Sequence, residues 1–362
     1  MGLTDLPEIY RGRRVLVTGH TGFKGGWLTF WLNQLGARVF GFALPPTTRP
    51  ALFEAVSLAS CVEHREGDIR DFARLQSVWR EVRPDVVFHL AAQPIVRESY
   101  RDPLTTVQTN VLGTANVLEQ VRLSQTPVAA IVITSDKCYE NQEWVFGYRE
   151  TDQLGGRDVY SASKGAAELL VSAWRRSFGG VNARGTLASV RAGNVIGGGD
   201  WACDRIVPDC IRALASDEPI LVRNPFAVRP WQHVLEPLSG YLELGCRLLA
   251  PSTEDRLRFA DAWNFGPMPE NARTVQEVVE ELLRHWGSGK WVDGRDSKAP
   301  HEAGLLRLCT DKARSILGWR PRWDFATTMR HTVEWYRAFY SGADMAAWCR
   351  RQIEAYSGAE LQ

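Results

Sequence analysis

The chain has 362 residues, of which 44% are hydrophobic and 23% charged, and a net charge of +1, as expected of an ordinary globular protein. A nearly neutral chain is not built to hold a polyanion, so we expect no nucleic-acid partner. No stretch approaches the roughly 18 apolar residues of a membrane span. The first residues lack the apolar core of a signal peptide, which predicts a cytoplasmic protein without a membrane partner.

The cysteines and histidines give no sign of a disulfide or a metal site. Seven cysteines are scattered without a C-x-x-C pair, and the seven histidines do not cluster, which is typical of reduced thiols without bound metal. Lysine is rare, with only six among 43 basic residues, and three of the six fall inside the motifs described below. Arginine keeps its proton in a protein, whereas lysine can lose it when its pKa is lowered, so a lysine kept in such a chain raises the question of its role.

Six strand-like runs alternate with helix-like segments over the first 194 residues. The runs occupy residues 14–19, 38–44, 62–68, 85–92, 128–135 and 186–193. The segments between them, such as 26–36 and 102–124, carry apolar residues at three- and four-residue spacing. This alternation predicts an α/β fold with a Rossmann-type, doubly wound parallel sheet.

The pattern changes after residue 194. Glycine-rich loops, prolines and tryptophans indicate irregular segments that line a pocket, and helical periodicity returns in 274–287 and 311–319. We therefore expect a dinucleotide-binding domain over 1–194, with short returns near 230–265. A smaller, interleaved C-terminal domain should occupy 195–362.

A glycine turn lies between the first strand and the first helix. Gly19, Gly22 and Gly25 are spaced G-x-x-G-x-x-G, unlike the G-x-G-x-x-G of the standard fingerprint. Glycines at this place allow a tight turn, a close approach to a pyrophosphate and exposure of the helix N-terminal amides. The turn predicts dinucleotide binding, although an ordinary strand-to-helix turn can also contain three glycines.

Two further strand ends follow in the order that a bound dinucleotide needs. Asp68 and Ile69 follow the third strand, where they can meet an adenine edge. The sequence "HLAAQ" at 89–93 follows the fourth strand, where small residues let a cofactor lie against the backbone. Taken alone, Asp68 can equally be an acid that ends a strand.

Tyr160 and Lys164 are spaced i and i+4, so they lie on one face of a helix. Tyrosine is a weak base at neutral pH because its ordinary pKa is about 10. A nearby ammonium group and a nicotinamide cation both favour phenolate, which makes the tyrosine a base for an alcohol. The alternative is a surface pair on an amphipathic helix.

The segment "TSDKCYENQEW" (134–144) directly follows the fifth strand. Residues just past the carboxyl ends of parallel strands reach the ligand crevice. The segment therefore brings a hydroxyl, an acid and an amine to that crevice as Ser135, Asp136 and Lys137.

In this order the motifs resemble those of the extended short-chain dehydrogenases/reductases. Within that family, the similarity runs from about residue 10 to about 335 and is greatest to the CDP-D-glucose 4,6-dehydratases. It is carried by "TGHTGFKGGWL", "TSDKCYENQEW", "GYRE", "YSASKG", "RAGNVIGGGDWACDRIVPD" and "RPWQHVLEPLSGYL".

The resemblance implies conversion of CDP-D-glucose to CDP-4-dehydro-6-deoxy-D-glucose and water, in deoxysugar synthesis of the O-antigen or lipopolysaccharide type. Carbon 4 is oxidised, water is eliminated across carbons 5 and 6, and the hydride returns to carbon 6. For the oxidation, the resemblance implies that Tyr160 takes the proton of the 4-hydroxyl. It also implies that Lys164 anchors the nicotinamide ribose and lowers the tyrosine pKa, and that Ser135 binds the developing ketone.

For the elimination, the resemblance implies Asp136 as the acid toward the 6-hydroxyl. Lys137 stands where dTDP-glucose dehydratases carry glutamate, which makes it the candidate base at carbon 5. A lysine acts as a base only when neutral, so burial or positive neighbours must lower its pKa. The alternative is an Asp136–Lys137 salt bridge that ends a strand.

The resemblance also implies NAD as cofactor. The residues expected to bind it are Gly19, Thr21, Gly22, Phe23, Gly25, Asp68, Ile69, Leu90, Ala91, Ala92, Thr109, Tyr160 and Lys164. NAD sites usually present an acid near the end of the second strand, but "VFGFALPPTT" has none. Arg49, just beyond, could meet a 2′-phosphate, so NADP stays open on the residues alone.

The substrate is expected to bind mainly in the C-terminal domain. Candidates for holding the nucleotide sugar are Asn194, Arg205, Arg229 and Asn264, although each could instead cap a loop or pair with an acid. The helices around 102–122 and 160–178 resemble those that pair two subunits in the family. This implies a homodimer or a dimer of dimers.

Three alternatives remain at this point. A nucleotide-sugar 4-epimerase would use the same glycine turn and Tyr160/Lys164 pair, but it needs no acid and base at carbons 5 and 6. Another nucleotide-sugar 4,6-dehydratase would differ only in the base it recognises. A non-catalytic NAD-binding module would not need Ser135, Tyr160 and Lys164 together.

Overall fold

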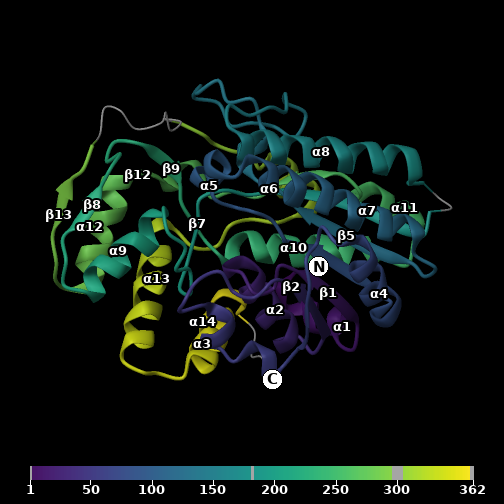
Figure 1. Ribbon diagram of the computed structural model, residues 1–362, viewed down its shortest axis with the longest axis horizontal. Helices are drawn as coiled ribbons and strands as arrows, with labels where there is room; N and C mark the ends of the chain where they lie inside the picture. The colour runs from purple at the N-terminus through teal and green to yellow at the C-terminus, as the bar shows by residue number, and fades with distance from the viewer. Residues whose placement is uncertain (1, 181–182, 296–304, 359–362) are drawn as a thin grey trace.

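A seven-stranded sheet forms the centre of the molecule (Figure 1). The computed structural model describes residues 2–180, 183–295 and 305–358. Within them the strand order is β11-β6-β5-β4-β1-β2-β3, and every neighbouring pair is parallel. The strands are β1 (Arg14–Thr18), β2 (Arg38–Ala43), β3 (Glu63–Glu66), β4 (Val86–His89), β5 (Val128–Ile133), β6 (Gly185–Arg191) and β11 (Ala262–Asn264). The predicted Rossmann-type, doubly wound sheet is confirmed.

Helices cover both faces of this sheet. They include α1 (Leu6–Tyr10), α2 (Phe23–Gln34), α4 (Phe72–Val82), α7 (Gly113–Leu123), α8 (Val159–Phe178) and α10 (Leu235–Leu248). Alternate side chains of β1 point to opposite faces: Val15 and Val17 share a core with α1, α2 and α10, whereas Leu16 shares one with α4, α7 and α8. Strands buried on both faces are continuously apolar, which explains why β5, with all six residues buried, is recognisable from sequence.

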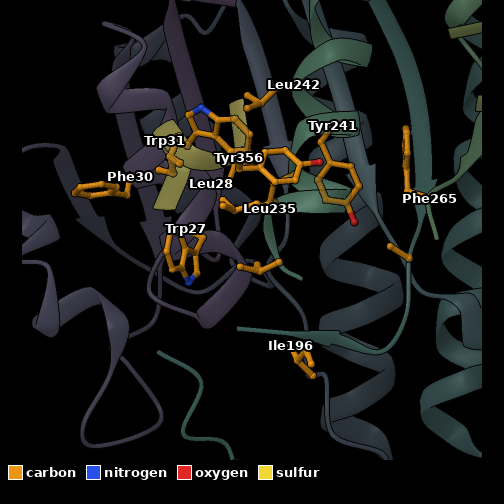
Figure 2. Close-up of a cluster of buried hydrophobic side chains, with 14 of the residues drawn as sticks. Trp27, Leu28, Phe30, Trp31, Ile196, Leu235, Tyr241, Leu242, Phe265 and Tyr356 are labelled. Atoms are coloured by element: carbon orange, nitrogen blue, oxygen red, sulfur yellow. The ribbon is translucent and has the colours of Figure 1, made fainter. Parts of the chain in front are cut away.

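Helix α2 is fixed by packing between two distant parts of the chain. Figure 2 shows its Trp27 and Trp31 among Leu235 of α10 and Tyr356 of α14 (Met345–Ser357), all of them fully buried. The rings of Trp31 and Tyr356 meet edge to face, with centroids 5.9 Å apart. This packing sets the place of the α2 N-terminus, and with it the place of the glycine turn.

A second group of elements lies apart from the large sheet, on the left of Figure 1. It comprises α9 (Ile206–Ala215), β8 (Ile220–Val222), β9 (Val228–Pro230), β12 (Ala272–Thr274), α12 (Val275–Trp286), β13 (Trp291–Asp293) and α13 (Phe325–Tyr340). Strand β13 pairs with β8 and β12 pairs with β9, each pair forming a two-stranded sheet. Two short strands, β7 (Val195–Ile196) and β10 (Gln232–His233), pair with each other between this group and the large sheet.

The remaining segments are short and connect these elements. They are α3 (Leu52–Ala55), α5 (Val96–Arg101), α6 (Pro103–Val107), α11 (Thr253–Phe259), the π-helical turns η3 (Gln108–Leu112) and η6 (Ala313–Leu317), and the 3₁₀ turns η1 (Leu3–Asp5), η2 (Leu58–Ser60), η4 (Asp136–Cys138) and η5 (Pro269–Asn271). The predicted helix over 102–124 is present as α6, η3 and α7 in succession. The predicted helix over 311–319 contains only the η6 turn as a named element.

No helix in the described part of the chain is both long and apolar enough to cross a membrane. The seven cysteines all lie in described segments and are free thiols. Among these same segments, no group of three or more histidine, cysteine or acidic side chains is arranged to hold a metal ion.

Candidate active site

The carboxyl ends of β1, β4, β5 and β6 open into one cavity of about 680 Å³. The cavity continues from the glycine turn after β1, past the segments that follow β4 and β5, to the loops around residues 192–209 and 221–231. Ligands of open parallel sheets bind at this edge. The sheet and the second group of elements thus contribute to the same site.

The glycine turn requires glycine at two of its three positions. Gly19 has a left-handed backbone, with φ of 76°, and a Cβ there would lie 2.6 Å from the amide nitrogen of Ala91. A Cβ on Gly25 would collide with the carbonyl oxygen of Gly19, so the first turn of α2 packs directly on the loop. The α2 N-terminus therefore faces the cavity with unpaired amides, an arrangement that fits a pyrophosphate.

The other residues expected to bind the cofactor line the same cavity. They are Thr21, Gly22, Phe23, Asp68, Ile69, Leu90, Ala91, Ala92 and Thr109. The carboxylate of Asp68 also accepts hydrogen bonds from the Arg70 side chain, the shortest at 2.6 Å, and these bonds hold its pKa below the ordinary value. At the end of β2, Thr47 and Thr48 line the cavity, whereas Arg49 is not among the described lining residues.

Tyr160 and Lys164 lie one turn apart on α8, and both are buried at the cavity wall. Burial raises the pKa of Tyr160 to about 12, while a hydrogen bond to Ser135 and the charge of Arg205 act in the opposite direction. Burial lowers the pKa of Lys164 to about 8, against the opposing charge of Glu168. A cation next to the phenol is what would make Tyr160 a usable base near neutral pH.

Ser135, Asp136 and Lys137 form the turn after β5, and all three line the cavity. The Ser135 hydroxyl caps η4 by accepting the amide N–H of Lys137 at 3.2 Å, and it donates to Asp136 Oδ1 at 3.0 Å. The Asp136 carboxylate is buried and takes its second contact from the Asn194 amide at 3.4 Å. Lys137 is exposed at the cavity edge and does not bind this carboxylate, so a salt bridge between the two is not what holds the turn.

Gly193 makes room for the acid. A Cβ on Gly193 would coincide with the carboxylate of Asp136, which lies flat against the backbone of the loop after β6. Only glycine at this position leaves that space open. The place of Asp136 is therefore set by residues from two strand ends, β5 and β6.

Three of the four candidates for substrate binding reach the cavity. Asn194, Arg205 and Arg229 all line it. Arg205 is paired with Asp200 at 2.8 Å, with the side chain of Asp200 almost completely buried, so the guanidinium is held in place next to Tyr160.

Asn264 does not reach the cavity. It ends β11, is fully buried, and its side-chain amide donates to the carbonyl oxygens of Tyr148 and Cys309 at 2.8 and 3.1 Å. Its amide oxygen accepts the hydroxyl of Tyr139 at 2.8 Å. With both ends of its amide engaged inside the protein, Asn264 has a structural role, and the expectation that it binds substrate is not supported.

Lys24, which was not among the predicted site residues, also lines the cavity. It lies in the first turn of α2 and donates to the Tyr241 hydroxyl at 3.0 Å. Burial, together with the charges of Lys164 and Arg205, lowers the pKa of Lys24 to about 7. Its position inside the glycine turn and the rarity of lysine are the signals that could have identified it.

A sequence profile of the family described as GDP-mannose 4,6 dehydratase matches residues 16–332 of this chain. The chain belongs to this family. Among curated relatives of the family, the CDP-glucose 4,6-dehydratase of Salmonella typhimurium strain LT2 is 49% identical over 358 residues, or 97% of this chain and 98% of the relative. The dTDP-glucose 4,6-dehydratase of Streptomyces antibioticus is 30% identical over 334 residues, or 89% of this chain and 92% of the relative.

Solved structures of the same fold include both dehydratases and epimerases. The UDP-glucose 4-epimerase of Thermotoga maritima, solved with UDP-glucose, superposes with a TM-score of 0.77 at 22% identity, over 90% of this chain and 99% of that one. The dTDP-glucose 4,6-dehydratase DesIV of Streptomyces venezuelae, solved with NAD, gives 0.74 at 23% identity, over 92% and 99%. At these identities the likeness establishes the fold and leaves the reaction to be argued from the site.

Proposed function

We propose that this protein is an NAD-dependent CDP-D-glucose 4,6-dehydratase, which converts CDP-D-glucose to CDP-4-dehydro-6-deoxy-D-glucose and water. The observation that carries the proposal is the meeting of two groups in one cavity: the Tyr160/Lys164 pair and the Ser135–Asp136–Lys137 turn. The choice of CDP-glucose among nucleotide sugars is supported by the 49% identity to the Salmonella enzyme of that name.

The cavity has the groups that NAD needs. The glycine turn and the α2 N-terminus would hold the diphosphate, Asp68 and Ile69 the adenosine end, and Lys164 the nicotinamide ribose. When bound, NAD accepts a hydride from carbon 4 of the sugar and later returns it to carbon 6. The protein's own groups must move the protons and hold the sugar during both steps.

In the oxidation, Tyr160 takes the proton of the 4-hydroxyl. Ser135, which is buried and within hydrogen-bonding reach of Tyr160, donates to the oxygen that becomes a ketone. Arg205, held by Asp200, favours the phenolate form of Tyr160 and so helps it to act as a base. These groups suffice for the first step, which a 4-epimerase shares.

In the elimination, the new ketone makes the proton on carbon 5 acidic. Lys137 takes that proton, and Asp136 gives a proton to the departing 6-hydroxyl, so that water leaves from carbon 6. The two groups come from neighbouring positions of one short turn, one buried and one exposed. This acid–base pair distinguishes the dehydratase from the epimerase on the same fold.

The test is conversion of CDP-D-glucose by the purified holoprotein in deuterated water, followed by NMR. The expected product is a 4-keto-6-deoxy sugar with solvent deuterium at carbon 5 and no net gain of NADH. Epimerised sugar would instead identify a 4-epimerase, and conversion of dTDP-glucose alone would identify a different nucleotide specificity. An unchanged spectrum with every nucleotide sugar would contradict catalysis.

We further propose a homodimer, built from the exposed apolar side chains on the outer helices, in which Leu104 of α6 and Leu169 of α8 are 72% and 61% exposed. Helices α6 and α8, which carry these side chains, pack against each other (Figure 1). A cytoplasmic location and a role in deoxysugar synthesis for O-antigen or lipopolysaccharide complete the proposal, the former supported by the free thiols.

A further inference from the structure

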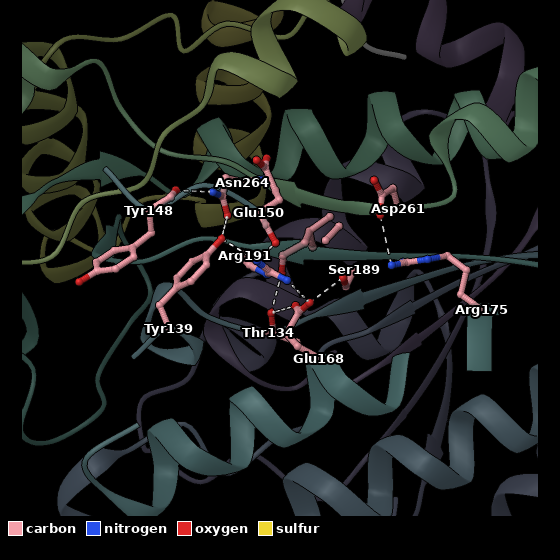
Figure 3. A network of polar contacts seen from close by, with 12 residues as sticks. Thr134, Tyr139, Tyr148, Glu150, Glu168, Arg175, Ser189, Arg191, Asp261 and Asn264 are labelled. Atoms are coloured by element: carbon pink, nitrogen blue, oxygen red, sulfur yellow. Dashed lines mark hydrogen bonds and ion pairs between the residues drawn. The ribbon is translucent and has the colours of Figure 1, made fainter. Parts of the chain in front are cut away.

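A buried ion pair lies directly behind the turn of residues 135–138, which we call the catalytic turn. Arg191 at the end of β6 and Glu168 of α8 are 2.7 Å apart, and their side chains are only 4% and 2% exposed (Figure 3). Removing two charges from water is costly, and such pairs persist only where further hydrogen bonds satisfy both partners. Neither side chain lines the cavity, so the pair does not touch the substrate.

The ion pair holds the N-terminal end of the catalytic turn. Thr134, the residue before Ser135, donates its hydroxyl to Glu168 Oε1 at 2.5 Å. Its backbone N–H donates to the carbonyl oxygen of Val190 at 2.9 Å, next to Arg191. The last residue before the reactive hydroxyl is thus bound both to the neighbouring strand and to one end of the ion pair.

The same pair also holds the C-terminal end of the turn, through contacts that we call the rear anchor. Tyr139 directly follows η4, and its hydroxyl accepts Arg191 Nη1 at 2.6 Å and donates to Asn264 Oδ1 at 2.8 Å. The guanidinium of Arg191 also lies over the Tyr139 ring, 4.9 Å from its centroid. Residues 135–138 therefore span two anchors, one on Glu168 and one on Arg191 (Figure 3).

Glu168 connects this network to the helix that carries the Tyr160/Lys164 pair. Tyr160, Lys164 and Glu168 follow at four-residue steps on one face of α8. The carboxylate of Glu168 favours the charged form of Lys164, as does Cys138, whereas burial disfavours it. Two further titratable groups face Lys164, namely Lys24 on α2 and His89 at the end of β4.

We propose that the Glu168–Arg191 pair is the positioning device of the active site. It holds the two ends of the turn that carries Ser135, Asp136 and Lys137, and it ties this turn to the helix of Tyr160 and Lys164. The catalytic roles of Ser135, Asp136 and Lys137 rest on the proposed function, whereas the contacts that hold their turn are a property of the folded chain. It also explains why Asn264 is buried, because its amide oxygen completes the rear anchor.

Three variants test the proposal in the NAD-bound protein. Glu168→Gln keeps the shape of the pair and removes its negative charge. The double variant Glu168→Met/Arg191→Met replaces the pair with apolar side chains, an exchange that often preserves stability. Tyr139→Phe removes only the hydroxyl of the rear anchor. Asp261→Asn is the matched control, since it removes ion pairs to Arg175 and Lys312, and within the described residues no hydrogen bond or ion pair joins the Asp261 side chain to Glu168 or Arg191 (Figure 3).

The double variant should show the cooperative melting of a folded protein. Its kcat should fall about 100-fold, which is the loss expected when reacting groups shift by about 1 Å. Its dissociation constants for NAD and CDP-glucose should be unchanged. Tyr139→Phe should slow elimination more than oxidation, so reduced nicotinamide accumulates in a single turnover. Asp261→Asn should behave like the wild type. A folded double variant with wild-type kcat would overturn the proposal.

A second readout does not depend on turnover. In Glu168→Gln, Lys164 loses the charge that favours its ammonium form, so its titration midpoint should move to lower pH. Competitive acetylation across a pH series, quantified on the Lys164 peptide by mass spectrometry, measures that midpoint. If the midpoint does not move in Glu168→Gln, the link to Lys164 is contradicted, whether or not the wild type converts CDP-glucose. If the midpoint moves but the wild type does not convert CDP-glucose, only the proposed function is contradicted.

Discussion

Asp136 and Lys137 are neighbours in sequence but have different surroundings. The acid is buried against Gly193 and the loop after β6, whereas the lysine is exposed at the cavity edge. Both side chains line the cavity, but from different depths.

Lys137→Ala should therefore separate the two halves of the reaction. We expect NAD and CDP-glucose to bind as in the wild type and oxidation to proceed, while elimination slows by about 100-fold or more, the usual contribution of a positioned base. Rapid mixing with detection of reduced nicotinamide checks this outcome. Asp136→Asn is the companion variant, with the same stall expected. Turnover close to wild type in Lys137→Ala would remove this lysine from the mechanism.

Lys24 predicts a pH dependence of stability. Its pKa is about 7 in the folded protein, against an ordinary value of 10.5. Below pH 7 the folded protein keeps a partly buried charge, which destabilises it. Between pH 7 and 10.5 the folded state releases this proton while the unfolded chain still holds it, so the free energy of unfolding from this group rises with pH.

Lys24→Met removes that titration. The variant should gain stability over the wild type most strongly at pH 6, and the gain should shrink by pH 9. Denaturant unfolding at both pH values measures the difference, and comparing the two cancels the pH-independent loss of the hydrogen bond to Tyr241. An equal difference at pH 6 and pH 9 would show that Lys24 does not carry the buried charge.

The elements best predicted from sequence are those whose pattern is local. All six predicted strands are present. Strands of a buried parallel sheet are uninterrupted apolar runs between turn residues, as in β5, whereas the edge strand β3 is polar. The glycine turn is recognisable for a similar reason, since its steric demands fall on two closely spaced positions, Gly19 and Gly25. Both signals are complete within about ten residues of chain.

The elements missed are those whose stability comes from distant contacts. The segment around α10 contains Pro237 and two glycines and was expected to be irregular, yet it is a helix buried between the sheet and α14. Strand β11 has only three residues and joins the sheet through its pairing with β6. Neither feature has a local pattern that separates it from a loop.

Side-chain direction was also beyond prediction. Asn264 and Ser135 both lie at or just past the end of a strand, at the same edge of the sheet, but Asn264 turns into the Tyr139–Arg191 network and Ser135 into the cavity. A motif identifies the edge of the sheet at which a residue lies. The direction of its side chain depends on the partners that the fold brings to it, here from residues more than a hundred positions away.

The exposed apolar side chains of α6 and α8 predict the oligomeric state of the whole molecule. Replacing Leu104 and Leu169 together with arginine should convert a dimer to a monomer, because it places charges in an apolar surface. Light scattering coupled to size-exclusion chromatography measures the mass. Phe226→Arg, at a side chain 64% exposed in the second group of elements, is the control and should remain dimeric. A wild type that is already monomeric contradicts the proposed dimer.

The division into domains at residue 194, with short returns of the first domain near 230–265, stays a prediction. The sheet takes β11 from beyond that boundary, and α10 packs on the sheet with α2. The cavity likewise takes residues from both sides of it. The site is complete only when the whole chain has folded.

The contact between Asp136 and Gly193 limits how such an enzyme can arise from an epimerase. Grafting an aspartate and a lysine onto the turn after β5 would not be enough, because any larger side chain opposite would expel the new acid from its site. The aspartate and the lysine must be introduced together with a glycine in a separate loop, the one that follows β6. Where the starting loop has a larger residue at that position, both changes are needed before either brings a gain in dehydration.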